Sequence, residues 1–198
     1  RGMIWYQGES DAAEQPAAVY EKKLLDLVDS VRRDTGSPDM AFIYVQIGRM
    51  IVPESDKPDL GREMLREAQR QASLGKRENV YMVSAVSEPL RDQFCHISAE
   101  SYERVGLRLA EVALSQVYHK PGYATPIGLD SVTASRTDQE IIVRVRFSGV
   151  NGKLKTFQGD QPAGFEFRKD ARAAKRAPIY FPTQFDPDDP ASILLTLR

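Results

Sequence analysis

The sequence predicts an α/β fold, a three-layer arrangement around a parallel sheet, followed by a small all-β module. Over residues 1–119, short apolar runs alternate with longer segments of helical periodicity. This alternation is typical of strand–helix–strand units with right-handed crossovers, which build parallel sheets. From about residue 129, short alternating segments are separated by Gly, Pro and Asp turns, as in antiparallel strands. The predicted division is an α/β part at 1–119, a linker at 120–128 and a β module at 129–198.

Three strands and three helices are predicted in the α/β part. The strands are expected at 2–6, 41–47 and 79–86, and the helices at 17–36, 61–76 and 98–118. Ser98 suits the N-cap of the last helix. The stripe of that helix expected to face the sheet consists of Tyr102, Val105, Leu109 and Val112. Because parallel sheets usually have five or more strands, we interpret this part as the C-terminal portion of a larger domain.

The β module is predicted to contain short strands separated by turns. They are expected at 130–137, 140–149, 152–157, 163–168, 179–182 and 192–198. The last of these runs to the final residue, so we interpret the module as truncated.

Composition excludes several functional classes. The net charge of −1 argues against a nucleic-acid binder, which usually carries a basic face. No apolar run approaches the ~18 residues of a membrane helix, so no membrane association is expected. A single cysteine excludes an internal disulfide and a multi-cysteine metal site. No Gly-rich strand–helix turn of the nucleotide-binding kind is present, and no cofactor is expected.

Polar residues follow the predicted strands at the edge where parallel sheets bind their ligands. Gln7 and Glu9 follow the first strand, and Asp92 and His96 lie in the loop after the third. An imidazole acts as a general base only when its tautomer is fixed, and a carboxylate on Nδ1 fixes it. We therefore expect Asp92 to orient His96, and Gln7 to share one pocket with them.

Three segments together resemble the SGNH-type carbohydrate esterases, in particular the sialate O-acetylesterase and acetylxylan esterase group. They are "WYQGES" at 5–10, "LREAQ" at 65–69, and His96 followed by "GLRLA" at 106–110. The resemblance covers about residues 2–118 and implies the C-terminal part of a flavodoxin-like fold. The "GFEF" and "IYFP" segments resemble the β module that often follows this catalytic domain. The implied function is a carbohydrate O-acetylesterase that uses Ser–His–Asp/Glu acyl transfer on an acetylated carbohydrate.

The resemblance also implies roles for individual residues. The Gln7 amide would donate to the tetrahedral oxyanion, an interaction worth roughly 3 kcal/mol in the transition state. Glu9 would orient Gln7 or His96, or replace Asp92 as the acid. The family's nucleophilic serine lies in a "GQSN"-like loop, a sequence that does not occur here. We expect it upstream of Arg1, in an N-terminal half of the same domain, and the family favours a secreted or periplasmic location.

Other assignments were weighed for the same loops. Ser10 is interpreted as a cap at the approach to a helix, since "GESDA" lacks the second glycine of a nucleophile elbow. Cys95 is not expected to be the nucleophile, because neighbouring residues on an extended loop point in opposite directions. Gln69 is expected to hold the loops above its helix. The alternative function is a catalytically inactive carbohydrate-binding α/β module.

Overall fold

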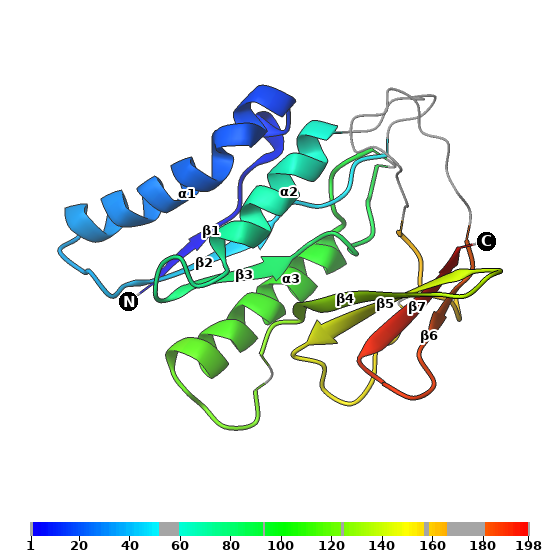
Figure 1. The fold of residues 1–198 in the computed structure, drawn as a ribbon. Helices are drawn as coiled ribbons and strands as arrows, with labels where there is room; N and C mark the ends of the chain where they lie inside the picture. The colour runs from blue at the N-terminus through cyan, green and yellow to red at the C-terminus, as the bar shows by residue number, and fades with distance from the viewer. Residues whose placement is uncertain are drawn as a thin grey trace. The chain divides into compact units, whose positions relative to one another are not determined.

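The computed structural model describes residues 2–51, 60–92, 94–123, 125–156, 159–165 and 181–197 of the chain. It separates into two compact units, Arg1–Tyr123 and Ala124–Arg198 (Figure 1). The division falls inside the segment 120–128 that was predicted as a linker. Each unit is described by itself below.

The first unit contains a parallel sheet of three strands. They are β1 (Gly2–Trp5), β2 (Ala41–Gln46) and β3 (Val80–Ser84), in the order β1-β2-β3. Every residue of β2 except the last is buried, as expected for a central strand between two layers of helices. All three predicted strands are present, each one to three residues shorter than expected.

Helices cover both faces of this sheet. Helices α1 (Glu14–Asp34) and α2 (Leu60–Ala72) pack on the face that carries Phe42 and Tyr44. Helix α3 (Ala99–Val112) packs on the opposite face, which carries Ile43 and Val45, and continues as a π-helical turn at Ala113–Val117. Successive residues of a strand point to opposite faces, so the short run 42–45 supplies both cores. The predicted three-layer arrangement is confirmed (Figure 1).

Two details of the helices differ from the sequence prediction. Helix α1 begins at Glu14 with Ala13 at its N-cap and no side-chain cap, so Ser10 does not cap it. Tyr102 was expected to face the sheet but is 55% exposed, whereas Val105 and Val112 are buried as predicted. The reason is that Tyr102 packs on Tyr6, which lies beyond the last residue of β1, so its ring is not beneath the sheet.

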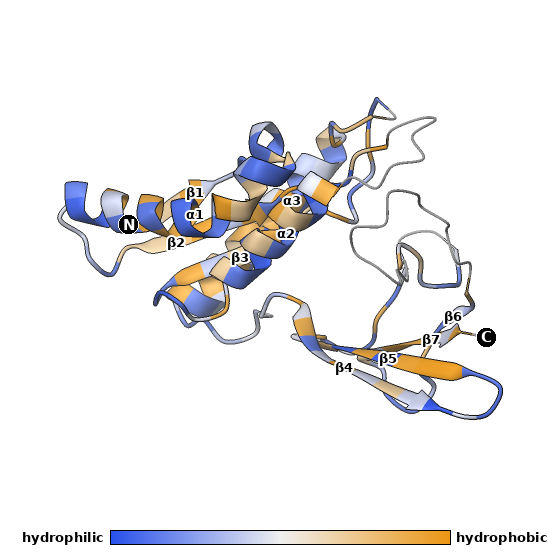
Figure 2. Ribbon diagram, turned by 45° about the horizontal axis from the view of Figure 1, so that its top comes forward, coloured by the Kyte–Doolittle hydropathy of each residue, from blue (hydrophilic) through white to orange (hydrophobic). Residues whose placement is uncertain are grey.

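The second unit is an antiparallel sheet of four strands in the order β4-β5-β7-β6. Its strands are β4 (Gly128–Arg136), β5 (Ile141–Ser148), β6 (Thr183–Phe185) and β7 (Ser192–Leu197). In Figure 2, β5 carries a strongly hydrophobic stretch. The all-β prediction is confirmed for this unit, and three of the predicted strands correspond to β4, β5 and β7.

The remaining strand predictions in the module were wrong wherever they can be compared. Residues 152–156, 163–165 and 181–182 are not strands, and the rest of those segments lies outside the described residues. Gly152 and Gly164 adopt positive φ values of 83° and 89°, which a strand does not contain. Strand β6 instead begins at Thr183, directly after the predicted 179–182 segment.

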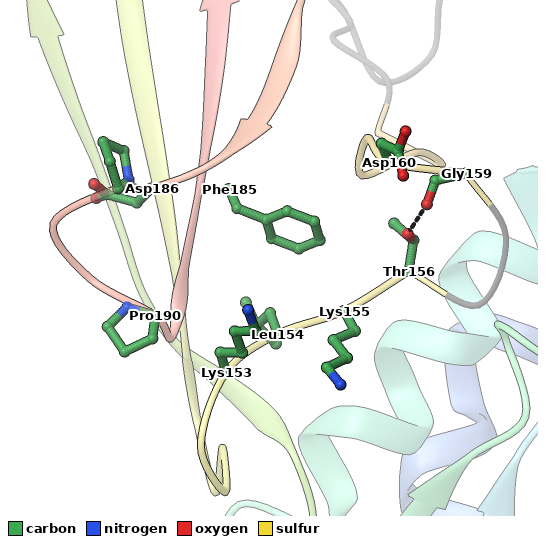
Figure 3. A pocket seen from close by; sticks show the side chains of 10 residues that line it. Lys153, Leu154, Lys155, Thr156, Gly159, Asp160, Phe185, Asp186 and Pro190 are labelled. Atoms are coloured by element: carbon green, nitrogen blue, oxygen red, sulfur yellow. Dashed lines mark hydrogen bonds between the residues drawn. The ribbon is translucent and has the colours of Figure 1, made fainter.

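A hollow of about 520 Å³ lies in the second unit between the 153–160 segment and the turn after β6 (Figure 3). Lys153, Lys155, Phe185 and Asp186 are among its lining residues, and all the others that line it also come from this unit. None of the residues expected at the active site, Gln7, Glu9, Asp92 and His96, lines this hollow.

No helix within the described ranges combines the length and the apolar character that crossing a bilayer requires.

Candidate active site

The loop after β3 is a narrow turn that presents Asp92 and His96 at its tip. Leu90 and Ile97 form an antiparallel bridge across the loop, and the Arg91 amide donates to the His96 carbonyl at 2.9 Å. Helix α3 begins directly afterwards, because the Ser98 hydroxyl accepts from the Ser101 amide at 3.2 Å. The loop is thus closed at its base by backbone pairing and followed at once by a capped helix, as the sequence predicted.

The Asp92 carboxylate uses its two oxygens differently. Oδ2 accepts the hydrogen bond of the His96 Nδ1–H. Oδ1 accepts backbone N–H groups of Phe94, Cys95 and His96 at 3.0, 3.2 and 3.2 Å. The bond from His96, followed by those from the backbone amides, holds the pKa of Asp92 well below its usual range. The predicted contact between Asp92 and His96 is therefore present.

This contact settles which nitrogen of His96 can accept a proton. Nδ1 carries its hydrogen toward Asp92, so the lone pair of Nε2 remains to act as a base. The His96 side chain is 58% exposed and that of Asp92 31%, so both can be reached from the carboxyl edge of the sheet. In this arrangement Asp92 can orient the imidazole, and Nε2 is the nitrogen that can accept a proton.

Cys95 does not point away from His96, contrary to the sequence prediction. Its Sγ lies 4.0 Å from His96 Nδ1. The loop is a tight turn around the Asp92 Oδ1 atom and not an extended segment, so neighbouring side chains converge. Nδ1 is nevertheless bonded to Asp92, so this nitrogen is not a base for the thiol.

Gln7 lies two residues after the end of β1, and its side chain is held by Tyr20 of helix α1 and by Asp11 before that helix. Its Oε1 accepts from the Tyr20 hydroxyl at 3.2 Å, and its Nε2 donates to Asp11 at 2.7 Å. The carboxylate that orients Gln7 is thus Asp11, whereas Glu9, an alternative from the sequence, is exposed. A carboxamide nitrogen carries two hydrogens, so one remains for a substrate. Among the described residues, no hydrogen bond joins the side chains of Gln7 and His96, and their sharing of one pocket stays a prediction.

Gln69 ties the ends of β1 and β2 to helix α2. It is 1% exposed, its Oε1 accepts from the Ile47 amide at 3.0 Å, and its Nε2 donates to the carbonyls of Gln7 and Val45 at 3.2 and 3.3 Å. Because both ends of this buried amide are hydrogen-bonded, Gln69 fixes the backbone at Gln7 relative to helix α2 and the end of β2. This is the holding role expected for Gln69.

Gly8 allows the same loop to pass close to α2. Its φ is +153°, and a Cβ there would lie 2.8 Å from Ile47 Cγ2 and 2.9 Å from Leu65 Cδ2. Both the backbone conformation and the available space therefore require glycine. The glycine of "WYQGES" is explained by packing.

Comparison with known proteins identifies the family. The family model described as "Carbohydrate esterase, sialic acid-specific acetylesterase" matches residues 1–115. The chain belongs to this family. A probable carbohydrate esterase of Arabidopsis thaliana is 31% identical over 117 residues, which are 58% of this chain and 40% of that protein. The resemblance predicted from the sequence is confirmed.

A solved structure supports the fold of this carbohydrate esterase chain. The crystal structure of a carbohydrate acetylesterase from Xanthomonas citri matches 98% of this chain and 41% of that one, with a TM-score of 0.74 and 19% sequence identity. At this identity the likeness concerns the fold alone. The chain spans about two fifths of the length of both relatives.

Sequence reasoning missed a buried ion-pair cluster beside the His96 loop of the esterase domain. The side chain of Glu88 is 2% exposed and pairs with Arg104 at 2.9 Å and with Arg108 at 2.7 Å. Arg108 also donates to the Ser84 carbonyl at the end of β3 at 2.8 Å. These contacts fasten the start of the loop to α3. Arg104 and Arg108 are four residues apart and so lie on one side of the helix, which could have indicated a shared acidic partner. The sequence does not show that this partner is Glu88.

Tyr6 was also missed, although it lies inside the "WYQGES" motif of the esterase family. Its ring packs on that of Tyr102, with centroids 6.4 Å apart and planes inclined by 57°. Burial, followed by the charge of Glu9, raises the pKa of Tyr6 to about 12. Glu88 adds to the increase and Arg62 opposes it. Charges contributed by the loops after β1 and β3 and by α2 therefore act on this one hydroxyl, which stays protonated at neutral pH.

Within the described ranges, no group of three or more His, Cys, Asp or Glu side chains is arranged to hold a metal ion.

Proposed function

We propose that this chain is part of a serine-type carbohydrate O-acetylesterase in which His96 is the general base and Asp92 its orienting acid. The observation that carries the proposal is the hydrogen bond from His96 Nδ1 to Asp92, which leaves Nε2 as the proton acceptor. Membership of the carbohydrate esterase family supports the substrate class. O-acetylated sialic acids are the first substrates to test, with acetylated xylose beside them.

The reaction would proceed by acyl transfer in two steps. A serine hydroxyl attacks the acetyl carbonyl while His96 Nε2 takes its proton, and the remaining N–H of Gln7 donates to the oxyanion. The intermediate collapses to an acetyl-serine, and the protonated His96 gives the proton to the departing sugar oxygen. Water then attacks the acetyl-serine with His96 again as the base, which releases acetate and restores the serine. Glu9 would take the place of Asp92 only if Asp92 proves dispensable.

We place the nucleophilic serine outside residues 1–198, in an N-terminal half of the same domain. This assignment rests on the sequence, in which no "GQSN"-like loop occurs. A secreted or periplasmic location is proposed on the family resemblance.

The test compares the natural full-length protein with this chain. In the full-length protein His96→Ala should lower kcat on an acetylated sugar by at least ~10³-fold, as removal of a triad base does. Cys95→Ala is the matched control one residue away and should keep most of the activity. Residues 1–198 alone should hydrolyse p-nitrophenyl acetate no faster than the denatured chain.

Two results would refute the assignment. Robust hydrolysis by the 198-residue chain would mean that the nucleophile lies within it, with Ser10 and Cys95 the first candidates. Sugar binding by the full-length protein without any hydrolysis would favour the alternative, a catalytically inactive carbohydrate-binding module.

A further inference from the structure

The contact between Tyr6 and Tyr102 brings together two segments that are distant in the sequence. Tyr6 immediately precedes Gln7 in the loop after β1, and Tyr102 lies in the first turns of α3, six residues after His96. The ring pair is therefore a direct connection between the two halves of the candidate site. A feature at this position lies where the substrate of the proposed esterase must bind.

Helix geometry directs the side chain of Tyr102 toward the N-terminal end of α3, which follows the loop that carries His96. Side chains on a helix lean toward its N-terminus, so that a residue covers the turn before its own Cα. Tyr102 is the fourth residue of α3, so its Cα lies only about 5 Å along the axis from the helix start. The region that it covers is thus the end of the Asp92–His96 loop.

Tyr102 leaves much of its side chain open to solvent, because it packs on Tyr6 beyond the end of β1 and not beneath the sheet. It is 55% exposed, although the stripe to which it belongs is otherwise buried at Val105 and Val112. Tyr6 contacts one part of its ring, and more than half of the surface of Tyr102 stays exposed. A tyrosine held in this way offers a large rigid contact area at a small entropic cost.

The surroundings of this ring pair combine apolar and charged groups. Glu9 is exposed next to Tyr6 and contributes to the increase of its pKa. The face of a pyranose ring presents C–H groups of slight positive charge, which the negative face of an aromatic ring attracts, while its rim presents hydroxyl groups. Aromatic walls with a few polar groups are also the usual composition of small-molecule sites.

We propose that Tyr102, supported by Tyr6, is the surface on which the sugar ring of the acetylated substrate stacks. The proposal rests on the proposed esterase function and adds to it the subsite that binds the carbohydrate. Tyr102 would position the sugar so that the acetyl group reaches His96, and it would take no part in proton transfer.

The experiment measures kcat and KM of the full-length protein on two esters. One is an O-acetylated sugar, and the other is triacetin, an acetate ester without a ring; p-nitrophenyl acetate is avoided because its own ring could stack on Tyr102. Tyr102→Ala should raise KM for the sugar ester about 5- to 10-fold, the size expected for one lost aromatic contact. Its kcat and both constants for triacetin should change by less than about twofold.

Three further variants separate stacking from other effects. Tyr102→Phe keeps the ring and should behave as the wild type, whereas Tyr102→Leu keeps apolar bulk without a ring and should behave as the alanine variant. Leu107→Ala is the matched control, since Leu107 is 60% exposed on the same helix but lies about 140° around its axis. Equal losses on both esters, or no change in KM for the sugar ester, would overturn the proposal.

A binding measurement distinguishes failure of this proposal from failure of the proposed function. If the wild-type protein hydrolyses neither ester, the esterase function is refuted. Calorimetric titration with the deacetylated sugar then decides the stacking proposal by itself. Weaker binding by Tyr102→Ala and Tyr102→Leu, but not by Tyr102→Phe, would support it, and unchanged binding by all three would overturn it.

Discussion

Substitution of Gly8 by alanine tests whether the loop after β1 is fixed by close packing. The new Cβ would lie 2.8 Å from Ile47 Cγ2 and 2.9 Å from Leu65 Cδ2, well inside van der Waals contact. Overpacking of this kind costs about 1–3 kcal/mol. The backbone conformation of Gly8, φ +153° and ψ −21°, is one that residues with a side chain rarely adopt, and it adds about 1–3 kcal/mol. Gly8→Ala should therefore lower the free energy of unfolding by about 2–6 kcal/mol.

Gly36 provides the matched control for this substitution. Its φ is also positive, +63°, but a Cβ there would meet nothing within 4 Å. Gly36→Ala should cost only the backbone term of about 1–2 kcal/mol. Urea unfolding of the 198-residue chain, followed by the fluorescence of its single tryptophan, Trp5, measures both. Equal shifts of the urea midpoint in the two variants would refute the packing argument.

Three other substitutions test contacts that hold the site. Gln69→Leu leaves the Ile47 amide and the carbonyls of Gln7 and Val45 without their hydrogen-bond partner. The free energy of unfolding, measured in urea, should therefore fall by about 2–4 kcal/mol. A loss below about 0.5 kcal/mol would contradict the connection between α2 and the strand ends. Glu88→Gln should lower the free energy of unfolding by about 2–4 kcal/mol in the same assay. The loss is smaller than for a fully buried ion pair because Arg104 and Arg108 are about one third exposed. An unchanged free energy of unfolding would show that the cluster does not contribute to stability. Asp92→Asn tests the lowered pKa of Asp92: its stabilising effect is fully present above about pH 5 and is lost on further acidification, so the stability difference from wild type should shrink as the pH falls from about 5 to below about 4. A difference that grows over this acid range would contradict the sign of the shift.

Features that depend on local patterns could be predicted from the sequence. The strands of the parallel sheet and the three helices follow from hydrophobic periodicity, which each segment carries by itself. The contact between Asp92 and His96 joins residues four apart in one loop, so it too was accessible. In the β module, Gly152 and Gly164 interrupt apolar runs that resemble strands. There the alternation of residues was insufficient, because a strand also needs a partner with which to pair.

Features that depend on distant segments could not be predicted in the same way. Gln7 is oriented by Tyr20, whose position is known only once α1 has packed on the sheet. In the sequence Glu88 resembles an ordinary loop carboxylate, and its ion pairs with Arg104 and Arg108 form only when α3 packs beside the loop. The exposure of Tyr102 depends on where β1 ends, since periodicity places the residue on the buried stripe. The sequence thus predicted the contact between Asp92 and His96, but not how the side chains of Gln7, Glu88 and Tyr102 are held.

The outer edge of β1 has a consequence for how the stability of this chain should be measured. β1 pairs with β2 on one side, and no strand among the described residues pairs with its other side; Ile4, at its centre, is 63% exposed. Any strand that docks there binds the folded chain and not the unfolded one, so mass action adds its binding free energy to that of folding. A docking partner present at 100 times its Kd would add about 2.7 kcal/mol. With such a strand bound, the melting temperature of this unit would depend on the concentration of the partner as well as on the internal contacts of the unit.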